Sequence, residues 1–219
     1  MAKDLALVLN NGSLNSAVTT ALAAQRFRTI LVYADMAAGG GGARSRAAYD
    51  QQVAHFKPYR EHTLPMPYLS ILHAPLDTHS VDPRQTGLLA PQLLSLLPIV
   101  AAASTFAAFY QAAALYLGLR IGPSGEDLSR ATEYVQIINE LIQVPCGQVD
   151  LEVITPLLEL EPWQVVDLGF QVTAPMEKAW SCSEEAAEPC GACRGCRGRE
   201  QAFIQAGRPD PMRAVKKSA

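Results

Sequence analysis

Four cysteines near the C-terminal end of the chain have the type and spacing of a metal site. Two C-x2-C steps follow a first cysteine that lies eight positions upstream, in the segment SCSEEAAEPCGACRGCRGRE. Thiolates are soft ligands, and four of them converge on a tetrahedral zinc ion at about 2.3 Å. The small residues Gly191, Ala192 and Gly195 between the ligands permit the tight turns that this convergence requires. The expected ligands are Cys182, Cys190, Cys193 and Cys196.

Two disulfides or free core cysteines are the alternatives to a zinc site, and the expected compartment decides between them. The N-terminal segment MAKDLALVLNN holds an apolar run of only five residues, Leu5 to Leu9, which is too short for a signal peptide. Nothing else marks the chain as secreted, so we expect a cytoplasmic protein with reduced cysteines and therefore zinc.

The composition limits the classes of partner. The chain has 219 residues, of which 49% are hydrophobic, and a net charge of −3. That balance predicts a sizeable core and gives no basic bias, so direct nucleic-acid binding is not expected. A charge-free stretch at 85–119 is long enough to cross a bilayer, but Pro98, Ser104 and Gln111 interrupt it. We expect it to form a fully buried helix in an α/β core, with no membrane contact.

A polar turn, Asn11 to Ser16, follows the first predicted strand and precedes a predicted helix at 17–25. A second predicted strand at 29–33 completes a βαβ unit, which implies a parallel sheet. Backbone N–H groups at such a helix N-terminus can bind a phosphate, and Asn15 and Ser16 can also simply cap the helix. The residues leave phosphate binding and a capped turn equally open.

The remaining pattern alternates helices and strands. Helices are predicted at 43–56, 99–117, 129–142 and 199–205, and strands at 119–121 and 149–154. Another helix is predicted to start at Pro162 and to end at Leu168, with Gly169 as its cap. The Pro-rich segment 62–91 is predicted to be a loop. The fold class is therefore α/β.

Several C-terminal motifs resemble those of the 7-cyano-7-deazaguanine synthases of queuosine biosynthesis. They are TPL at 155–157, a helix at 163–168, WSC at 180–182 and the run CGACRGCR at 190–197, and the resemblance covers most of the chain in order. It implies a Rossmann-like, adenine-nucleotide alpha-hydrolase-like fold, a zinc ion on the four cysteines, and a homodimer. It also implies ATP with magnesium, which would activate a 7-carboxy-7-deazaguanine carboxylate for conversion by ammonia to the nitrile.

The chain departs from this family at the phosphate loop. Family members have S-G-G-x-D-S where this chain has Asn11, Gly12, Ser13, Leu14, Asn15 and Ser16. The lost glycine hinders close approach of phosphate, and the change from Asp to Asn removes a negative charge that could help to hold magnesium. Two further family motifs, Y-G-Q-R-H and a Pro followed by Arg-Asn, are absent. The substrate-side loop is partly kept, with Gly122, Asp127 and Ser129, and Glu133 in place of Asp.

These observations give two hypotheses. The first is a protein that kept the fold and changed or lost the ATP chemistry, either a pseudoenzyme or a binding protein for a purine-like ligand. The second is an active ATP-dependent carbon–nitrogen ligase of this family; the sequence leaves its catalytic residues unknown. The predicted organisation is a Rossmann-like domain at 1–170, a zinc-binding module at 171–206 and a flexible tail at 207–219. The turn at 11–16 and the loop at 122–129 are expected to flank one cleft.

Overall fold

The computed structural model describes residues 4–36, 42–69, 89–123, 125–147 and 150–214. Its centre is a five-stranded parallel sheet with the order β3-β2-β1-β4-β5. The strands are β1 (Leu5–Leu9), β2 (Arg28–Asp35), β3 (Arg60–Pro65), β4 (Ala114–Leu117) and β5 (Glu152–Ile154). The chain order reverses between β1 and β4, and ligands bind at such switch points in parallel α/β sheets.

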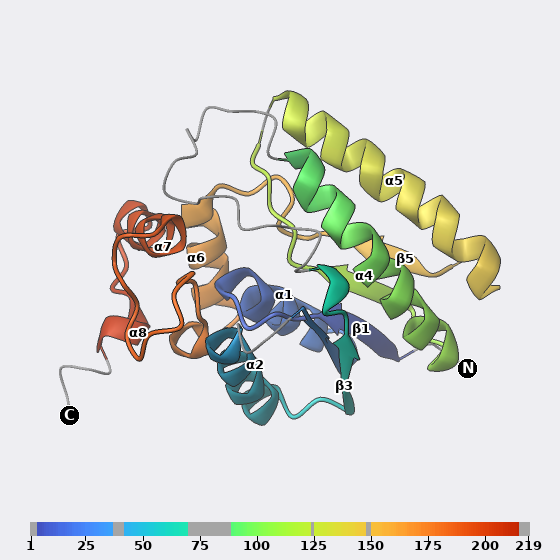
Figure 1. Ribbon diagram of the computed structural model, residues 1–219, viewed down its shortest axis with the longest axis horizontal. Coiled ribbons are helices and arrows are strands. Elements are labelled where there is room, and N and C mark those ends of the chain that lie inside the picture. Colours follow the sequence, from blue (N-terminus) through green and yellow to red (C-terminus); the bar gives the residue numbers. More distant parts are fainter. Residues whose placement is uncertain (1–3, 37–41, 70–88, 124, 148–149, 215–219) are drawn as a thin grey trace.

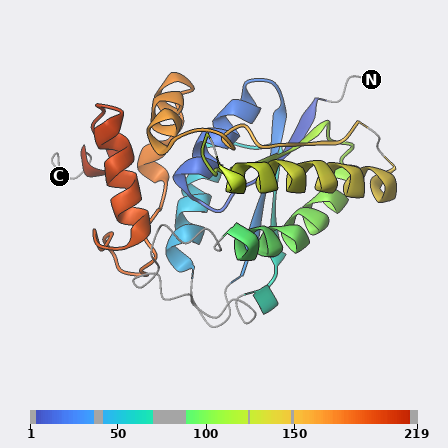
Figure 2. The same cartoon turned by 90° about the horizontal axis from the view of Figure 1, so that it is seen from above.

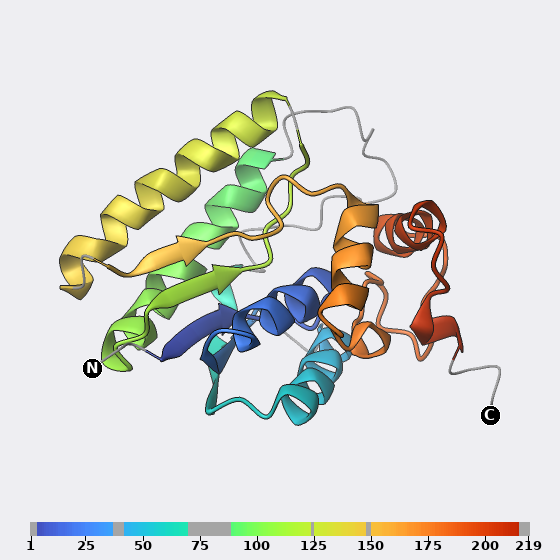
Figure 3. The same cartoon turned by 180° about the vertical axis from the view of Figure 1, so that it is seen from behind.

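Helices cover both faces of the sheet (Figures 1 and 3). On one face lie α4 (Leu89–Phe109) and α5 (Glu126–Cys146), and on the other lie α1 (Leu14–Ala24), α2 (Ala43–Phe56) and α6 (Pro162–Gln171). Alternate strand residues divide between the two cores: Leu7 packs on the α4 and α5 side, whereas Ala6 and Val8 pack on the α1 and α2 side. The predicted Rossmann-like architecture is confirmed.

The C-terminal elements gather at one end of the molecule, beside α6 (Figure 2). They are a 3-10 turn at Met176–Lys178, α7 (Arg194–Gln205) and α8 (Pro211–Ala214). Phe203 of α7 and Val165 of α6 share a core with Val18 of α1, so the end module packs on the main body. The predicted tail at 207–219 is therefore structured as far as Ala214, while 215–219 lie outside the described residues. The division at residue 170 stays a prediction.

Two strands differ from the prediction. β3 occupies the start of a segment predicted to be a loop, because its exposed, polar residues are those of an edge strand. β4 falls within the predicted helix 99–117, and the strand predicted at 119–121 is wrong. The helix ends earlier, at Phe109, where Gln111 takes a positive φ of 52° and turns the chain into the sheet.

Three helix details also differ. α1 begins at Leu14 with Ser13 as its cap, so Asn15 and Ser16 lie inside the first turn. Gly169 is inside α6 and does not cap it; a Cβ there would lie 2.6 Å from Met176 Sδ, so the glycine permits close packing. α4 is half-buried and not fully buried, with Val100 covered and Phe109 79% exposed. Among the described residues, no helix combines the length and apolarity that a bilayer span requires.

Candidate functional site

The turn after β1 is closed on itself by hydrogen bonds. The Asn11 carboxamide oxygen accepts from the Ser16 hydroxyl at 2.7 Å and from the Ser13 N–H at 3.1 Å. The Ser13 hydroxyl accepts from the Ser16 N–H at 3.2 Å, as a helix N-cap does. The Ser13 N–H, the Ser16 N–H and the Ser16 hydroxyl, three donors that could hold a phosphate oxygen, are thus bound to side chains of the turn itself.

A buried polar cluster, which the sequence analysis did not single out, fixes the turn from below. Asn10 donates to Thr20 at 3.0 Å and to Gln52 at 2.9 Å, and its own oxygen accepts from the Gly12 N–H at 2.8 Å. Gln52 in turn donates to the Gly12 carbonyl at 3.0 Å. Gly12 has a φ of +78°, and a Cβ there would lie 2.3 Å from the Ser45 carbonyl oxygen, so only glycine fits. The turn is therefore rigidly placed against α2.

A cleft of about 290 Å³ opens at the carboxyl ends of β1, β2 and β4. Polar groups of the turn form one side, and aliphatic side chains of the strands and of α4 form the others. Asn15 donates to the Gly118 carbonyl at 3.3 Å and so ties the turn to the end of β4. No lining residue that the structure describes is charged. The lining residues are Leu9, Asn10, Asn11, Ser13, Asn15, Ser16, Val32, Ala34, Met36, Leu96, Ile99, Leu117, Gly118 and Leu119.

The structure brings only part of the predicted site together. Asn11, Ser13, Asn15 and Ser16 line the cleft as expected. The second flank is Gly118 and Leu119, which come directly after β4, and none of the described residues of the loop at 122–129 lines the cleft. Gly122, Asp127, Ser129 and Glu133 lie outside the described lining, the last three on α5. Their role in binding stays a prediction, as does that of the turn.

The four predicted cysteines form a compact cluster. Their sulfur atoms all lie within 4.8 Å of one another, and no disulfide joins them. Cys182 and Cys190 are 3.5 Å apart, and Cys182 and Cys193 are 3.9 Å apart. Tetrahedral ligands at 2.3 Å from one ion would be separated by roughly 3.8 Å. The cluster could therefore hold a metal ion.

The backbone around the cluster favours thiolates. Five N–H groups point at the sulfur atoms of Cys182, Cys190 and Cys193 from 3.3 to 3.5 Å. Burial alone raises the pKa of Cys193, yet the N–H groups of Ser183 and Cys196 lower it to about 6. Burial and the neighbouring sulfurs raise the pKa of Cys196 to about 12. A bound cation would offset the repulsion between neighbouring thiolates and allow all four sulfurs to ionise.

Direct contacts connect the segment that holds the cysteine cluster to the turn. The Trp180 N–H donates to the Gly12 carbonyl at 2.9 Å. Glu185, in the loop between the first two cysteines, accepts from the N–H groups of Gly42 and Arg44 at 2.7 and 3.1 Å. A carboxylate at this position caps the start of α2 and complements its dipole. The module thus supports both the turn and the helix behind it.

Comparison with known protein families gives a match over the C-terminal half of the chain. A family model described as "Queuosine biosynthesis protein QueC" matches residues 97–207, which are 111 of the 219 residues. The chain belongs to the QueC family. The match contains the four cysteines and most of α4, whereas the turn at 11–16 lies outside it. The family model therefore covers about half of the chain, where the resemblance was expected over most of it.

Individual relatives agree with the family assignment. The 7-cyano-7-deazaguanine synthase of Aliarcobacter butzleri is 35% identical over 103 residues, 47% of this QueC-family chain and 45% of the relative. That of Methanothrix thermoacetophila is 28% identical over 138 residues, 62% and 59% of the two chains. The matches span about half the length of these curated relatives.

Solved structures support the fold alone. An NMN synthetase from Francisella tularensis superposes with a TM-score of 0.50 at 14% identity, over 95% of this chain and 79% of that one. The U34-tRNA thiolase NcsA from Methanococcus maripaludis, solved with its [4Fe-4S] cluster, gives 0.52 at 11% identity, over 94% and 66%.

Proposed function

We propose that this chain is a 7-cyano-7-deazaguanine synthase-like protein whose ATP-dependent chemistry is altered or lost, and that its cleft binds a purine-like ligand. One observation carries the proposal: the Asn11 oxygen occupies the Ser13 and Ser16 donors. A phosphate group would have to displace Asn11 and leave its amide to find new partners, which opposes binding.

The walls of the cleft support the same ligand class. Aliphatic side chains such as Val32, Leu96 and Ile99 suit a flat, largely apolar ring, and the amides of Asn11 and Asn15 suit its polar edge. A triphosphate needs cations, and the described lining supplies none. The family's Asp, which could help to hold magnesium, is Asn15 here.

We propose zinc as the metal on the four cysteines, because a closed set of four thiolates is typical of structural zinc sites. Its role would be to fold the module that supports Gly12 and α2. The homodimer, the absence of nucleic-acid and membrane contacts, and the cytoplasmic location stay predictions. Three exposed apolar residues of α5, Ile137, Leu141 and Val144, lie on one helix face that a second copy could cover.

The test of this function is a synthase assay on the full, metal-loaded chain with 7-carboxy-7-deazaguanine, ammonia and Mg-ATP. We expect saturable binding of the deazaguanine and neither ATP consumption nor nitrile. The alternative is an active ligase, and nitrile formed in step with ATP consumption would establish that alternative and overturn the proposal.

Replacing Asn11 by Ala is expected to strengthen Mg-ATP binding roughly tenfold, because it frees the Ser13 and Ser16 donors for a charged acceptor. Isothermal titration of the variant and the wild type measures this. Asn11→Asp is the matched control, since it keeps the acceptor oxygen and adds a negative charge, so that Mg-ATP binding should not improve. Equal Mg-ATP affinities for the wild type and Asn11→Ala would show that the closed turn does not limit phosphate binding.

A further inference from the structure

The loop between the first two cysteines docks on the start of a helix that is distant in the chain. Its residues 183–188 are all exposed and form no helix or strand. From this loop the Glu185 carboxylate accepts from the Gly42 N–H at 2.7 Å and from the Arg44 N–H at 3.1 Å, with one oxygen for each donor. Glu185 lies 143 positions after Gly42, so the carboxylate joins the cysteine module to α2 across most of the chain.

The start of α2 has no cap of its own. Gly42 precedes the helix with a φ of 86° and offers no side-chain acceptor, and the first turn of the helix contains no acidic residue. The first N–H groups of a helix have no partner within the helix and carry a partial positive charge. Glu185 therefore supplies, from outside, the acceptor and the negative charge that the sequence around the start of α2 lacks.

The first turns of α2 also determine where the turn after β1 lies. A Cβ on Gly12 would lie 2.3 Å from the Ser45 carbonyl oxygen and 2.9 Å from the Tyr49 nitrogen, so the turn packs directly on the backbone of α2. Gln52 of the same helix donates to the Gly12 carbonyl at 3.0 Å. A displaced start of α2 would therefore change the contacts that hold Gly12.

A metal ion would fix the loop that carries Glu185. The loop begins at Cys182 and ends at Cys190, whose sulfur atoms are 3.5 Å apart. Two thiolates at this distance repel each other, and a shared cation would hold them together. With both ends held, the loop has fewer conformations to lose, so placing Glu185 on α2 costs less entropy.

We propose that Glu185 is a positioning residue that couples occupancy of the metal site to the start of α2 and, through α2, to the turn at 11–16. Coupling between two sites is reciprocal, so the docking of Glu185 on α2 strengthens metal binding by the same factor by which the metal strengthens the docking. The inference rests on the metal site proposed above and goes beyond it, because it assigns a role to a residue outside the four ligands.

The test is the zinc affinity of the full, reduced chain, measured by competition with a chromophoric chelator. Glu185→Ala is expected to bind zinc roughly fivefold more weakly than the wild type, and Glu185→Gln, which keeps a neutral acceptor, should fall between them. In the zinc-loaded proteins, residue-resolved hydrogen exchange should show faster exchange of the Gly42 and Arg44 amides in Glu185→Ala. A role confined to capping α2 would change the exchange and leave the zinc affinity unchanged.

Glu184→Ala is the matched control. Glu184 is exposed, has the same charge and lies one residue closer to Cys182, but its carboxylate makes no hydrogen bond to the described part of α2. The substitution keeps its backbone N–H, which donates to the Cys182 sulfur. This variant should have the zinc affinity and amide exchange of the wild type.

The outcomes separate the coupling from the metal site itself. A Glu185→Ala protein with the zinc affinity of the wild type, or an equal loss in Glu184→Ala, would overturn the coupling and leave the metal site standing. A wild type that binds no zinc would overturn both.

Discussion

Replacing Cys193 by Ser is expected to release the metal and to destabilise the C-terminal module. Cys193 is 1% exposed, its sulfur accepts two backbone N–H groups, and it caps the start of α7. The loss should be large, since structural zinc contributes on the order of 10 kcal/mol to the folding of small modules. Elemental analysis and chemical unfolding followed by circular dichroism measure the two effects.

Cys146→Ser is the control for this variant. Cys146 is half-buried on α5, away from the cluster, so the substitution should leave the metal content unchanged. If the Cys193→Ser protein kept a full equivalent of metal and unfolded like the wild type, the cluster would not be a structural metal site.

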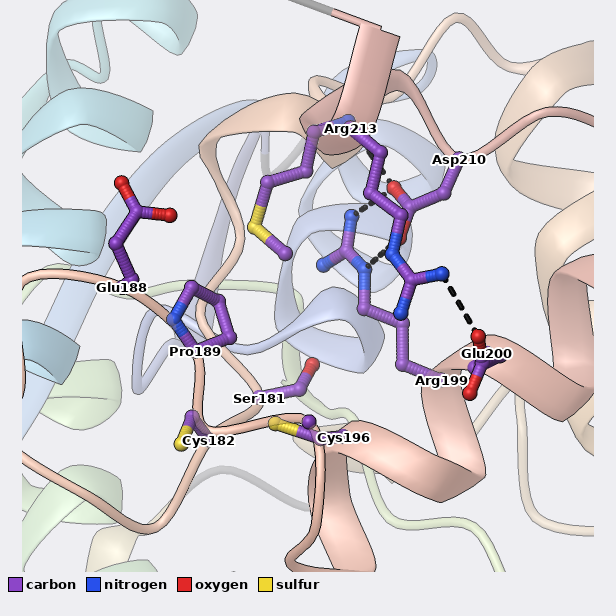
Figure 4. Close-up of a pocket in the computed structure, with 11 residues that line it drawn as sticks. Ser181, Cys182, Glu188, Pro189, Cys196, Arg199, Glu200, Asp210 and Arg213 are labelled. Carbon is purple, nitrogen blue, oxygen red and sulfur yellow. Dashed lines mark hydrogen bonds and ion pairs between the residues drawn. The ribbon is translucent and has the colours of Figure 1, made fainter. Parts of the chain in front are cut away.

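Replacing Arg199 by Met is expected to cost about 3–5 kcal/mol of the free energy of unfolding, because it leaves a buried carboxylate without its partner. Arg199 and Asp210 form two hydrogen bonds of 2.7 Å, and their side chains are only 5% and 8% exposed. Arg199 also donates to the carbonyls of Met176 and Ala179, at 2.8 and 3.0 Å. Arg199 therefore links α7 to residues 176 and 179, which precede the cysteines, and to Asp210, which follows the helix. Figure 4 shows the pair of Arg199 and Asp210.

The neighbouring pair of Arg213 and Glu200 provides the control, because it lies beside the first pair but is exposed to solvent. Arg213→Met should cost about 0–1 kcal/mol. The double variant Arg199→Met with Asp210→Leu should recover part of the lost stability, since it removes the unpaired charge. Denaturant unfolding of the four proteins tests this; equal losses in Arg199→Met and Arg213→Met would contradict the assigned role.

Local patterns in the sequence predicted the elements whose signals are local. The turn between β1 and α1, the whole of α2 and the first residue of α6 follow from apolar runs, helix formers and Pro162. β4 was missed because Ala114–Leu117 is four apolar residues that continue an Ala-rich helix pattern, and periodicity cannot separate the two. β3 was missed because its strand conformation depends on pairing with β2, and the local sequence does not encode that contact.

The same distinction holds for the candidate site. The cysteines are close in sequence, so their spacing predicted the cluster that the structure contains. The placement of the turn against α2 depends on Asn10 reaching Gln52 across 42 positions, and the cleft wall depends on Leu96 and Ile99 of α4. Such contacts form only when the fold brings distant segments together, and no sequence motif marks them.

The most direct test of the account is whether the full, zinc-loaded protein consumes ATP when 7-carboxy-7-deazaguanine and ammonia are supplied. Asn11 closes the phosphate turn and the described lining of the cleft has no charged residue, so we predict no ATP consumption above the rate without enzyme, and no nitrile product. Turnover near the ordinary enzymatic rate of roughly 10 s⁻¹, with ATP consumed as nitrile forms, would contradict the account.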